Sequence, residues 1–363
     1  MQHTELAIIG GGCAGLSAAI DAARAGVQVT LIDEHARAGG QLFKQIHKFF
    51  GSEAHMAGAR GYDIGECLLG ECRELGVRVL LSTVAYGIFP ERLIGIATQT
   101  GVDELQAERI IIATGASENP LAFSGWTLPG VMGAGAAQTL MNVHRVLPGR
   151  RVLIVGAGNV GLIVGFQLRQ AGAEVVAVVE ATDRVTGYMI HAAKLARTEV
   201  PILLRHTIAE ASGNGRVERA IVEPVGNTEG ERLAFDVDCV CIAVGLSPLA
   251  ELAHMAECRM AYLPELGGHV PLHDENMQTS APGVYIAGDV AGVEEVNTAM
   301  DEGRLAGVAA AESLGKIEPR EAGGRKGLIR ERLDGLRLGP FGEHRQRAKQ
   351  KLQTMLRQDE SGV

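Results

Sequence analysis

Three glycines close to the N-terminus carry the clearest chemical signal in the sequence. Gly10, Gly12 and Gly15 form the pattern G-x-G-x-x-G, and an acidic residue, Asp33, follows about 20 residues later. In this pattern the first glycine permits a tight turn, the second lets the backbone approach a pyrophosphate, and the third lets a helix pack closely on a strand. The acidic side chain would accept hydrogen bonds from a ribose. The pattern therefore predicts a bound dinucleotide, with its pyrophosphate at a helix N-terminus.

The segments on either side of these glycines have the character needed to position them. Residues 5–9 are an apolar run of strand length, an Ala-rich helical stretch ends at Ala25, and residues 27–32 form a second strand that ends at Asp33. Together they make a complete βαβ unit. The alternative is a glycine-rich turn of an α/β fold that binds no nucleotide. Because strand, helix, second strand and acidic residue are all in register, we favour the nucleotide site.

The same arrangement occurs a second time in the chain. Residues 151–155 form a strand, a helix follows, and a further strand ends at Glu180. The glycines of this second pattern are Gly156, Gly158 and Gly161, each 146 positions after its counterpart in the first. A second full pattern is far more specific than the first alone, so the sequence predicts two dinucleotide sites.

Three further predicted strands each end in a residue pair that contains glycine. Residues 107–113 run into Thr114-Gly115, and residues 238–243 run into Val244-Gly245 in the same way. Residues 278–289 combine a Pro-Gly turn and a short apolar strand with a final Gly-Asp pair.

Length and composition limit the classes of function that remain. The 363 residues suffice for two domains, and 48 glycines with 4% aromatic residues suit an α/β protein with many tight backbone approaches. A net charge of −9 disfavours wholesale nucleic-acid binding. The longest apolar run, residues 152–166, is broken by glycine and is too short to span a bilayer. The chain begins directly with a strand and lacks a basic leader, so we expect it to be cytoplasmic.

Cysteine and histidine do not form a recognisable metal or redox motif. The six cysteines have no zinc or iron–sulfur spacing. Cys67 and Cys72 have the spacing of some redox disulfides, but in a helix they point to different faces, so we favour structural thiols. Cys239 and Cys241 share one face of an apolar strand and are expected to be buried thiols. Pro271, between His269 and His273, breaks any helix that would pair the histidines, so no metal site is predicted.

The last part of the chain differs in charge from the rest. Residues 299–314 are an Ala-rich helix, and residues 318–363 then carry 11 Lys and Arg against 7 Asp and Glu. Residues 326–336 and 343–356 are predicted to be helical, with a break at Gly339-Pro340. This tail is either a solvated surface segment or a docking arm for an acidic partner, and we favour the first.

In order along the chain, the motifs GGGCAG, GGQ, ATG, GAGNVG, AVG and TSAPGVYIAGD resemble the flavoproteins with two dinucleotide-binding domains, the superfamily of glutathione and thioredoxin reductases. The resemblance covers about residues 5–315. Two stretches, IDEHARAGGQLFKQ and ENPLAFSGWTLPGVMGAGAAQTLMN, look most like the FAD-containing alpha subunits of hydrogen cyanide synthase, opine oxidase, hydroxyproline dehydrogenase and heteromeric sarcosine oxidase. These are multi-subunit enzymes that oxidise amines and amino acids.

The resemblance implies FAD on the first glycine pattern. Asp289 would bind the ribitol hydroxyls, and the helix that begins near Asn297 would aim its N-terminus at the N1–C2=O edge of the flavin, where a positive dipole favours the anionic reduced form. The backbone near Ala85 would contact the adenine. The full set of FAD-binding residues that the resemblance implies is Gly10, Gly12, Ala14, Gly15, Asp33, Glu34, Gly40, Gln41, Ala85, Thr114, Gly115, Gly288, Asp289, Asn297 and Thr298.

The second glycine pattern would bind a second nucleotide. Glu180 suits a free ribose 2′-hydroxyl and would repel a 2′-phosphate, so NAD(H) is preferred to NADP(H). The alternative is a purely structural nucleotide site that holds another adenine nucleotide. The residues implied at this site are Gly156, Gly158, Asn159, Val160, Gly161, Glu180 and Gly245.

The sequence departs from its relatives at two points that bear on chemistry. Disulfide reductases carry a redox cysteine pair after the GG loop or in the second domain, whereas residues 121–200 here contain no cysteine, which argues against disulfide reduction. No cysteine follows Cys258, so an iron–sulfur centre would have to come from another subunit. Lys44, His47 and His191 could lie near the cofactor, but we expect them at the surface and assign no catalytic acid or base.

We therefore predict an α/β fold with two Rossmann-like domains, a discontinuous FAD domain (residues 1–120 and 262–317), an inserted NAD-type domain (121–261) and a helical tail (318–363). The predicted function is that of an FAD-dependent electron-transfer subunit of a heteromeric amino-acid or imino-acid dehydrogenase. A second flavoprotein and a small iron–sulfur protein are its expected partners. Two alternatives stay open: a self-sufficient NADH:acceptor oxidoreductase, and a non-catalytic assembly subunit whose FAD is structural.

Overall fold

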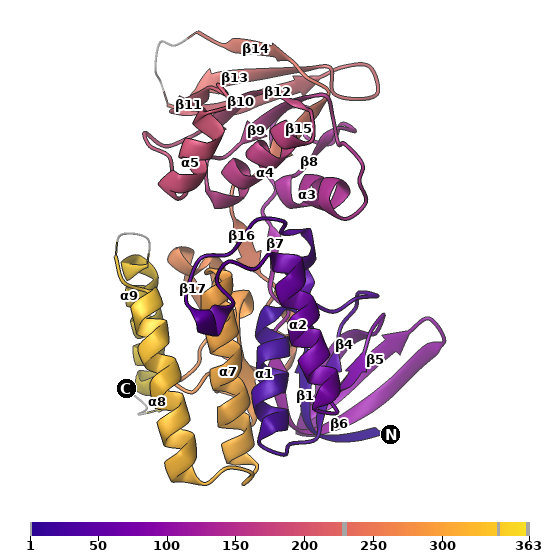
Figure 1. Cartoon of the computed structure of the whole chain (residues 1–363), viewed down its shortest axis with the longest axis vertical. Coiled ribbons are helices and arrows are strands. Elements are labelled where there is room, and N and C mark those ends of the chain that lie inside the picture. Colours follow the sequence, from indigo (N-terminus) through magenta and orange to yellow (C-terminus); the bar gives the residue numbers. More distant parts are fainter. Residues whose placement is uncertain (1, 227–230, 340–341, 361–363) are drawn as a thin grey trace. The chain divides into compact units, whose positions relative to one another are not determined.

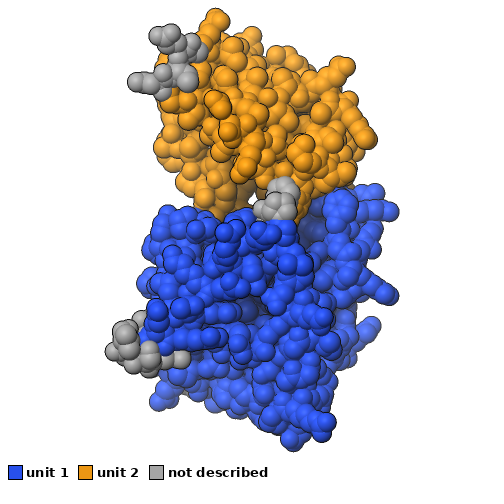
Figure 2. Space-filling view, turned by 90° about the vertical axis from the view of Figure 1, so that its left-hand side faces the viewer, with its two compact units in different colours: residues 1–117, 247–363 blue, residues 118–246 orange. Residues whose placement is uncertain are grey.

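The computed structural model describes residues 2–226, 231–339 and 342–360, which form two compact units (Figure 2). Residues 1–117 and 247–363 make the first unit, and residues 118–246 make the second. The change back to the first unit therefore comes earlier than the predicted boundary at residue 261. The physical reason is helix α6 (Glu251–Met255), which packs on strand β4 (Val84–Phe89) and contributes Leu252 and Ala253 to the core of the first unit.

The first unit is built on a mixed sheet in the order β3-β2-β1-β6-β5-β4, with β19 also paired to β6. Strands β3, β2, β1, β6 and β19 are parallel to their neighbours, while β4, β5 and the first half of β6 form an antiparallel meander. The strands are β1 (Gln2–Ile9), β2 (Val29–Ile32), β3 (Arg78–Leu80), β4, β5 (Leu93–Thr98), β6 (Gly101–Ile112) and β19 (Val284–Ile286). Residues 6–9 of β1, 29–32 of β2, 110–112 of β6 and 284–286 of β19 are buried and, apart from Thr30, apolar, as the parallel centre of such a sheet requires.

Helices α2 (Gly61–Glu74), α1 (Cys13–Arg24) and α7 (Val296–Ser313) lie side by side on one face of this sheet (Figure 1). Two glycines of α7 allow it to touch α1: a Cβ on Gly303 would lie 2.1 Å from the carbonyl oxygen of Ala14, and one on Gly307 would lie 2.4 Å from that of Ala18. This backbone contact fixes the start of α7 beside the first glycine turn.

The second unit repeats the plan on a smaller scale. Its parallel sheet has the order β11-β10-β9-β15-β8, and a three-stranded antiparallel sheet, β12-β13-β14, contributes to a second apolar cluster with it. The strands are β8 (Val131–Gly133), β9 (Arg151–Val155), β10 (Glu174–Glu180), β11 (Ile202–Leu204), β12 (His206–Ser212), β13 (Arg219–Pro224), β14 (Leu233–Asp236) and β15 (Cys239–Ile242). The helices are α3 (Ala134–Asn142), α4 (Asn159–Gln170) and α5 (Met189–Ala196).

The remaining elements are short. Strands β7 (Ala116–Glu118) and β16 (Leu246–Pro248) pair where the chain passes between the units, and β17 (Met260–Leu263) pairs with β18 (Gly268–Pro271). Single helical turns occur at η1 (Gly40–Lys44), η2 (Glu53–His55), η3 (Pro90–Arg92), η4 (Pro264–Leu266) and η5 (Asp289–Ala291). None of the helices in the described part of the chain has the length and apolar character needed to cross a bilayer.

The C-terminal tail folds onto the first unit as two helices, α8 (Pro319–Leu336) and α9 (Glu343–Glu360). The predicted helices lie within these bounds, and Pro340 of the predicted break lies outside the described residues. Helix α8 packs on α7, while Ala348, Leu352 and Leu356 of α9 share an apolar cluster with β17 and β18. The prediction of a solvated surface segment is therefore wrong for the inner faces of both helices. One face of each is buried through apolar side chains: Ala322, Ile329 and Leu333 in α8, and Ala348, Leu352 and Leu356, spaced four residues apart, in α9.

The fold class predicted from the sequence, two Rossmann-like α/β units with a helical C-terminal tail, is confirmed.

Candidate dinucleotide-binding sites

The first glycine turn has the geometry that its sequence pattern predicts. Gly10 has φ +107°, and a Cβ there would lie 2.2 Å from the carbonyl oxygen of Ala113. A Cβ on Gly15 would lie 1.9 Å from the carbonyl oxygen of Gly10, so only glycine permits this approach of helix α1 to the turn. Gly12 is different, because no heavy atom lies within 4 Å of its Cβ position. The N-terminus of α1 thus has open space beside Gly12, as a bound pyrophosphate requires.

The carboxylate of Asp33 holds this turn in place. Its Oδ2 accepts the Gly11 N–H at 2.7 Å, and its Oδ1 accepts the His35 N–H at 2.8 Å. Asp33 is buried, whereas the neighbouring Glu34 is exposed. The structure thus gives Asp33 a definite role in shaping the glycine turn, and its contact with a ribose stays a prediction.

The second unit reproduces the same geometry. Gly156 has φ +109°, with its Cβ position 2.2 Å from the carbonyl oxygen of Ala243, and the Cβ position of Gly161 lies 2.1 Å from the carbonyl oxygen of Gly156. The Cβ position of Gly158 has only the hydroxyl of Thr186 within 4 Å, at 3.8 Å. The sequence repeat is thus also a repeat of two tight contacts and one open position.

Glu180 holds the second turn as Asp33 holds the first. Its Oε2 accepts the Ala157 N–H at 2.8 Å, and its Oε1 accepts the backbone and hydroxyl hydrogens of Thr182, each at 3.0 Å. Asn159 accepts the Tyr188 N–H at 2.7 Å through Oδ1, which orders the segment after β10. Val160 is exposed at the start of α4.

Asp289 is the third residue after the end of β19, in the first unit. The residue as a whole is partly exposed, but the surrounding protein desolvates its carboxyl group. This desolvation raises the pKa of Asp289 to about 7, and the negative charges of Glu302, Glu295 and Glu294 act in the same direction. The backbone N–H of Glu294 donates to Oδ1 at a long 3.3 Å. A desolvated carboxyl of this kind suits a ligand that brings hydroxyl donors.

The loop that carries Asp289 lies close to the start of α1. Gly288 has φ +77°, and a Cβ there would lie 2.8 Å from that of Ala14 at the start of α1. The Cys13 thiol nearby has its pKa raised to about 12, first by burial and then by the charge of Asp289. The open side of Gly12, the N-terminus of α1 and the acceptor Asp289 therefore fit FAD, whose pyrophosphate and ribitol they would receive.

The start of α7 is anchored by a loop that the sequence did not point to. Asn297 donates from Nδ2 to the carbonyl oxygen of Phe50 at 2.8 Å, and Thr298 is buried. His55 Nε2 lies 2.9 Å from Asp301 Oδ2, and Arg304 donates to the carbonyl oxygen of Ala54 at 2.6 Å. These contacts join residues about 250 positions apart, so no local pattern could reveal them.

The other predicted FAD-binding residues lie at varied depths. Gly40 is close to the glycine turn, with its Cβ position 2.9 Å from Cα of Gly12, while Gln41 is exposed. Ala85 is half-buried on β4. Thr114 donates from its hydroxyl to the carbonyl oxygen of Leu249 at 2.7 Å, which ties the end of β6 to the returning chain.

Gly115 follows strand β6 and Gly245 follows strand β15, and both adopt the positive φ angle that glycine tolerates. Gly115 has φ +77° and Gly245 has φ +120°, and the carbonyl oxygen of Gly245 accepts the Asn119 N–H at 3.0 Å.

The expected placement of the candidate acid–base residues needs one correction. His191 is buried, and burial lowers its pKa; it is not the surface residue that was expected. It lies on the inner face of α5 with Ala192 and Leu195, a position that the short helical pattern did not resolve. Lys44 and His47 are half-buried. The cysteines are free thiols, with Cys67 exposed, Cys72 buried, and the Sγ atoms of Cys239 and Cys241 3.8 Å apart in the core.

Comparison with known proteins agrees with this geometry. The family model described as pyridine nucleotide-disulphide oxidoreductase matches residues 4–303. An opine oxidase subunit from Rhizobium meliloti (strain 1021) is 30% identical over 338 residues, which cover 87% of this chain and 72% of that protein. The alpha subunit of sarcosine oxidase from the same strain is 30% identical over 86% of this chain, which corresponds to only 30% of its own length.

Among solved structures, thioredoxin reductase of T. acidophilum superposes with a TM-score of 0.72 at 21% identity, covering 86% of this chain and 99% of that one. This likeness concerns the fold.

Proposed function

The chain belongs to the pyridine nucleotide-disulphide oxidoreductase family, and from this premise we propose that it is the electron-transfer subunit of a heteromeric amino-acid or imino-acid dehydrogenase. Membership makes it an FAD-dependent oxidoreductase, since the family binds FAD and a nicotinamide dinucleotide. The finer statement, its place in a complex, rests chiefly on the 30% identity to the opine oxidase subunit. That relative and the alpha subunit of sarcosine oxidase are both named as subunits of larger enzymes.

The roles that we propose for the two units follow their geometry. The first unit would hold FAD between the open side of Gly12 and the carboxyl of Asp289, and the second would hold NAD(H) beside Gly158. Glu180 would accept hydrogen bonds from the free hydroxyls of the adenosine ribose and would repel a 2′-phosphate. FAD supplies the hydride-accepting chemistry, while the protein binds the nucleotides, orients them and excludes water.

Other activities of the family fit this chain less well. A disulfide reductase needs a cysteine pair beside the flavin, but the helix α3 that follows β8 reads AGAAQTLMN, and no cysteine occurs between Cys72 and Cys239. We therefore propose that the electrons travel between FAD, NAD(H) and an external carrier in a complex with a second flavoprotein and a small iron–sulfur protein.

Affinity purification of the tagged chain from its own cells tests this proposal. We expect a second flavoprotein to co-purify, and we expect the complex to be reduced anaerobically by a member of a panel of amino and imino acids such as sarcosine, proline and opines. The isolated chain should not be reduced by any of these substrates. NADH should exchange electrons with the complex faster than NADPH does.

The competing functions give different results in the same experiment. Rapid bleaching of the isolated chain by NADH, with no co-purifying flavoprotein, would identify a self-sufficient NADH:acceptor oxidoreductase. A flavin that neither NADH nor any substrate reduces, in the complex or alone, would identify a non-catalytic assembly protein.

A further inference from the structure

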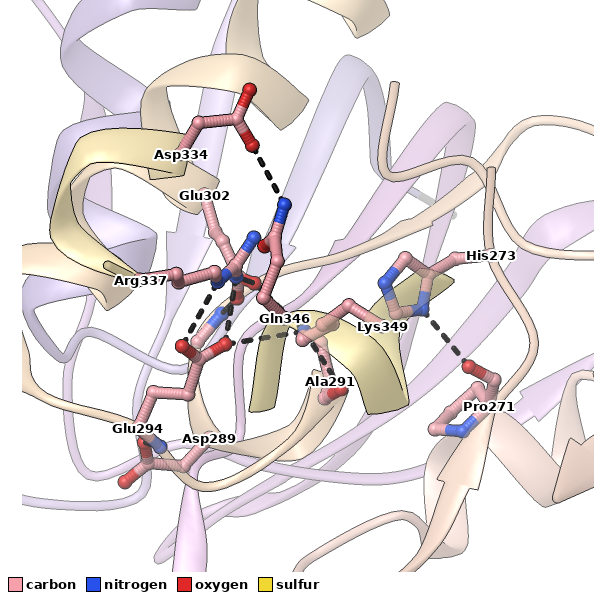
Figure 3. Close-up of polar contacts among 11 residues, drawn as sticks. Pro271, His273, Asp289, Ala291, Glu294, Glu302, Asp334, Arg337, Gln346 and Lys349 are labelled. Atoms are coloured by element: carbon pink, nitrogen blue, oxygen red, sulfur yellow. Dashed lines mark hydrogen bonds and ion pairs between the residues drawn. The ribbon is translucent and has the colours of Figure 1, made fainter. Parts of the chain in front are cut away.

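Four charged side chains meet beside the loop that carries Asp289 (Figure 3). They are Glu294 from the loop, Glu302 from α7, Arg337 from the end of α8 and Lys349 from α9. Their exposed fractions are only 2–9%. Burying two ion pairs is costly unless each charge is fully paired, so such a cluster needs a reason beyond stability.

Arg337 binds the loop through a bidentate ion pair with Glu294. Its Nε donates to Oε2 of Glu294 at 2.9 Å and its Nη2 donates to Oε1 at 2.7 Å. The same Nη2 donates to Oε1 of Glu302 at 2.6 Å. Paired, charge-assisted hydrogen bonds of this kind fix orientation as well as distance.

Lys349 completes the contact from the other helix. Its Nζ donates to Oε1 of Glu302 at 2.7 Å and to the carbonyl oxygen of Ala291 at 2.9 Å. Oε2 of Glu302 in turn accepts the Gly288 N–H at 3.0 Å. The loop is therefore held on both sides of Asp289: at Gly288, which precedes it, and at Ala291 and Glu294, which follow it.

The two cations come from the part of the chain beyond the family match, so the match does not assign them a role. Helices α8 and α9 are themselves joined by Gln346, whose Nε2 donates to Asp334 Oδ1 at 2.8 Å (Figure 3). The positive charge of the tail thus meets acidic groups of its own chain at this position. These contacts are within one chain, so a docking arm for a separate acidic partner stays an untested prediction.

We propose that Arg337 and Lys349 are positioning residues, through which α8 and α9 clamp the Asp289 loop in the conformation that receives the ribitol of FAD. This inference rests on the proposed FAD site of the first unit. It does not depend on the identity of the substrate or of the partner proteins.

The cluster also balances the charges that face Asp289. Glu294, Glu295 and Glu302 approach it from the loop and α7, and Cys13 approaches from α1, while Arg337 and Lys349 offset two of the carboxylates. His273, next to Lys349, is neutral, because burial and then the Lys349 charge lower its pKa to about 3. Removal of Lys349 would leave Glu294 and Glu302 to share the single positive charge of Arg337, and the added negative charge near Asp289 would make its carboxyl ionise at higher pH.

Lys349→Met in the full chain tests the clamp, with Lys351→Met, an exposed lysine of the same helix, as its matched control. FAD binding is measured by quenching of flavin fluorescence from pH 5 to 9. We expect Lys349→Met to weaken binding at pH 6 by about tenfold for each unit by which the pKa of Asp289 rises, and to move the midpoint of the pH dependence upward. Lys351→Met should match the wild type.

Two further variants separate positioning from loss of fold. Lys349→Arg should restore most of the affinity, and the double variant Lys349→Met with Glu302→Gln should return the midpoint towards the wild-type value, because it rebalances the charge and keeps an acceptor for Gly288. The proposal is overturned if Lys349→Met lowers the melting temperature but leaves both the affinity and the midpoint unchanged. A wild-type chain that binds no FAD would instead refute the proposed function.

Discussion

Gly12→Asp is expected to abolish FAD binding without unfolding the protein. No heavy atom outside the neighbouring residues lies within 4 Å of the Cβ position of Gly12, so the new side chain starts in open space, where the pyrophosphate would lie. A carboxylate in contact with a phosphate costs several kcal/mol, which corresponds to at least about a 1,000-fold loss of affinity. The measurement is FAD affinity by fluorescence quenching, together with the visible spectrum of the purified chain.

The apoprotein should be as stable as the wild type or slightly more stable. Gly12 is the N-cap of α1, with an extended φ of −74° and ψ of −173°, and no side chain caps the helix there. Aspartate is among the preferred N-cap residues and exceeds glycine by only a few tenths of a kcal/mol. Thermal unfolding of the FAD-free forms checks this point.

The second unit offers a matched control. Gly158 is the N-cap of α4, with φ −74° and ψ 179°, and only the Thr186 hydroxyl, at 3.8 Å, lies within 4 Å of its Cβ position. Gly158→Asp should leave FAD bound and remove the response to NADH. If both variants lost FAD equally, or if Gly12→Asp kept it, the assignment of the two turns would be wrong.

Asp289→Asn should have the second largest effect, with opposite consequences for binding and for stability. At pH 8 the variant loses the charge on an acceptor of the ribitol hydroxyls. Hydrogen bonds to a charged group contribute about 1.5–3 kcal/mol, so we expect FAD to bind about 10- to 100-fold more weakly. Asp103→Asn, at an exposed carboxylate on β6, is the control that should change nothing.

The stability of the apoprotein should rise in the same variant. The pKa of Asp289 is raised from 3.8 to about 7 in the folded chain, so its contribution to stability is greatest below the unfolded pKa and is lost as the pH rises through 7. This rise corresponds to at most about 4 kcal/mol at pH 8. Asp289→Asn should therefore increase the free energy of unfolding at pH 8 and change it little at pH 4.

The pH dependence of FAD binding provides an independent check. Hydroxyl donors of the ligand favour the carboxylate, so the complex has a lower Asp289 pKa than the free protein. FAD affinity should then increase as the pH rises towards about 7 and level off above it, and Asp289→Asn should remove this step. A pH-independent affinity in the wild type would contradict the role given to Asp289.

The two nucleotide turns could be predicted from the sequence because their chemistry is local. Gly10, Gly15, Gly156 and Gly161 are required by contacts within one βαβ unit, and a fixed spacing is enough to identify them. For the same reason the repeat of the fold was predictable, and the family and its cofactors, FAD and a nicotinamide dinucleotide, followed and are confirmed.

The contacts of Arg337 and Lys349 with the Asp289 loop, and those of residues 50–55 with α7, could not be predicted in this way. Lys349 and Ala291 lie 58 positions apart, and Arg304 and Ala54 lie 250 apart, so only the tertiary fold brings them together. The net charge of the tail was also misleading, because an excess of Lys and Arg is typical of a helix face exposed to solvent. The burial of Arg337 and Lys349 depends on which helix face meets α7 and η5, and a weak apolar pattern in α8 does not specify that face.

The most direct test of the central claim is the content of FAD in freshly purified, folded chain, titrated to saturation and compared with Gly12→Asp. The account predicts one FAD in the wild-type chain in addition to any nucleotide of the second unit, and none in the variant. A folded wild-type protein that is colourless and takes up no FAD would contradict it.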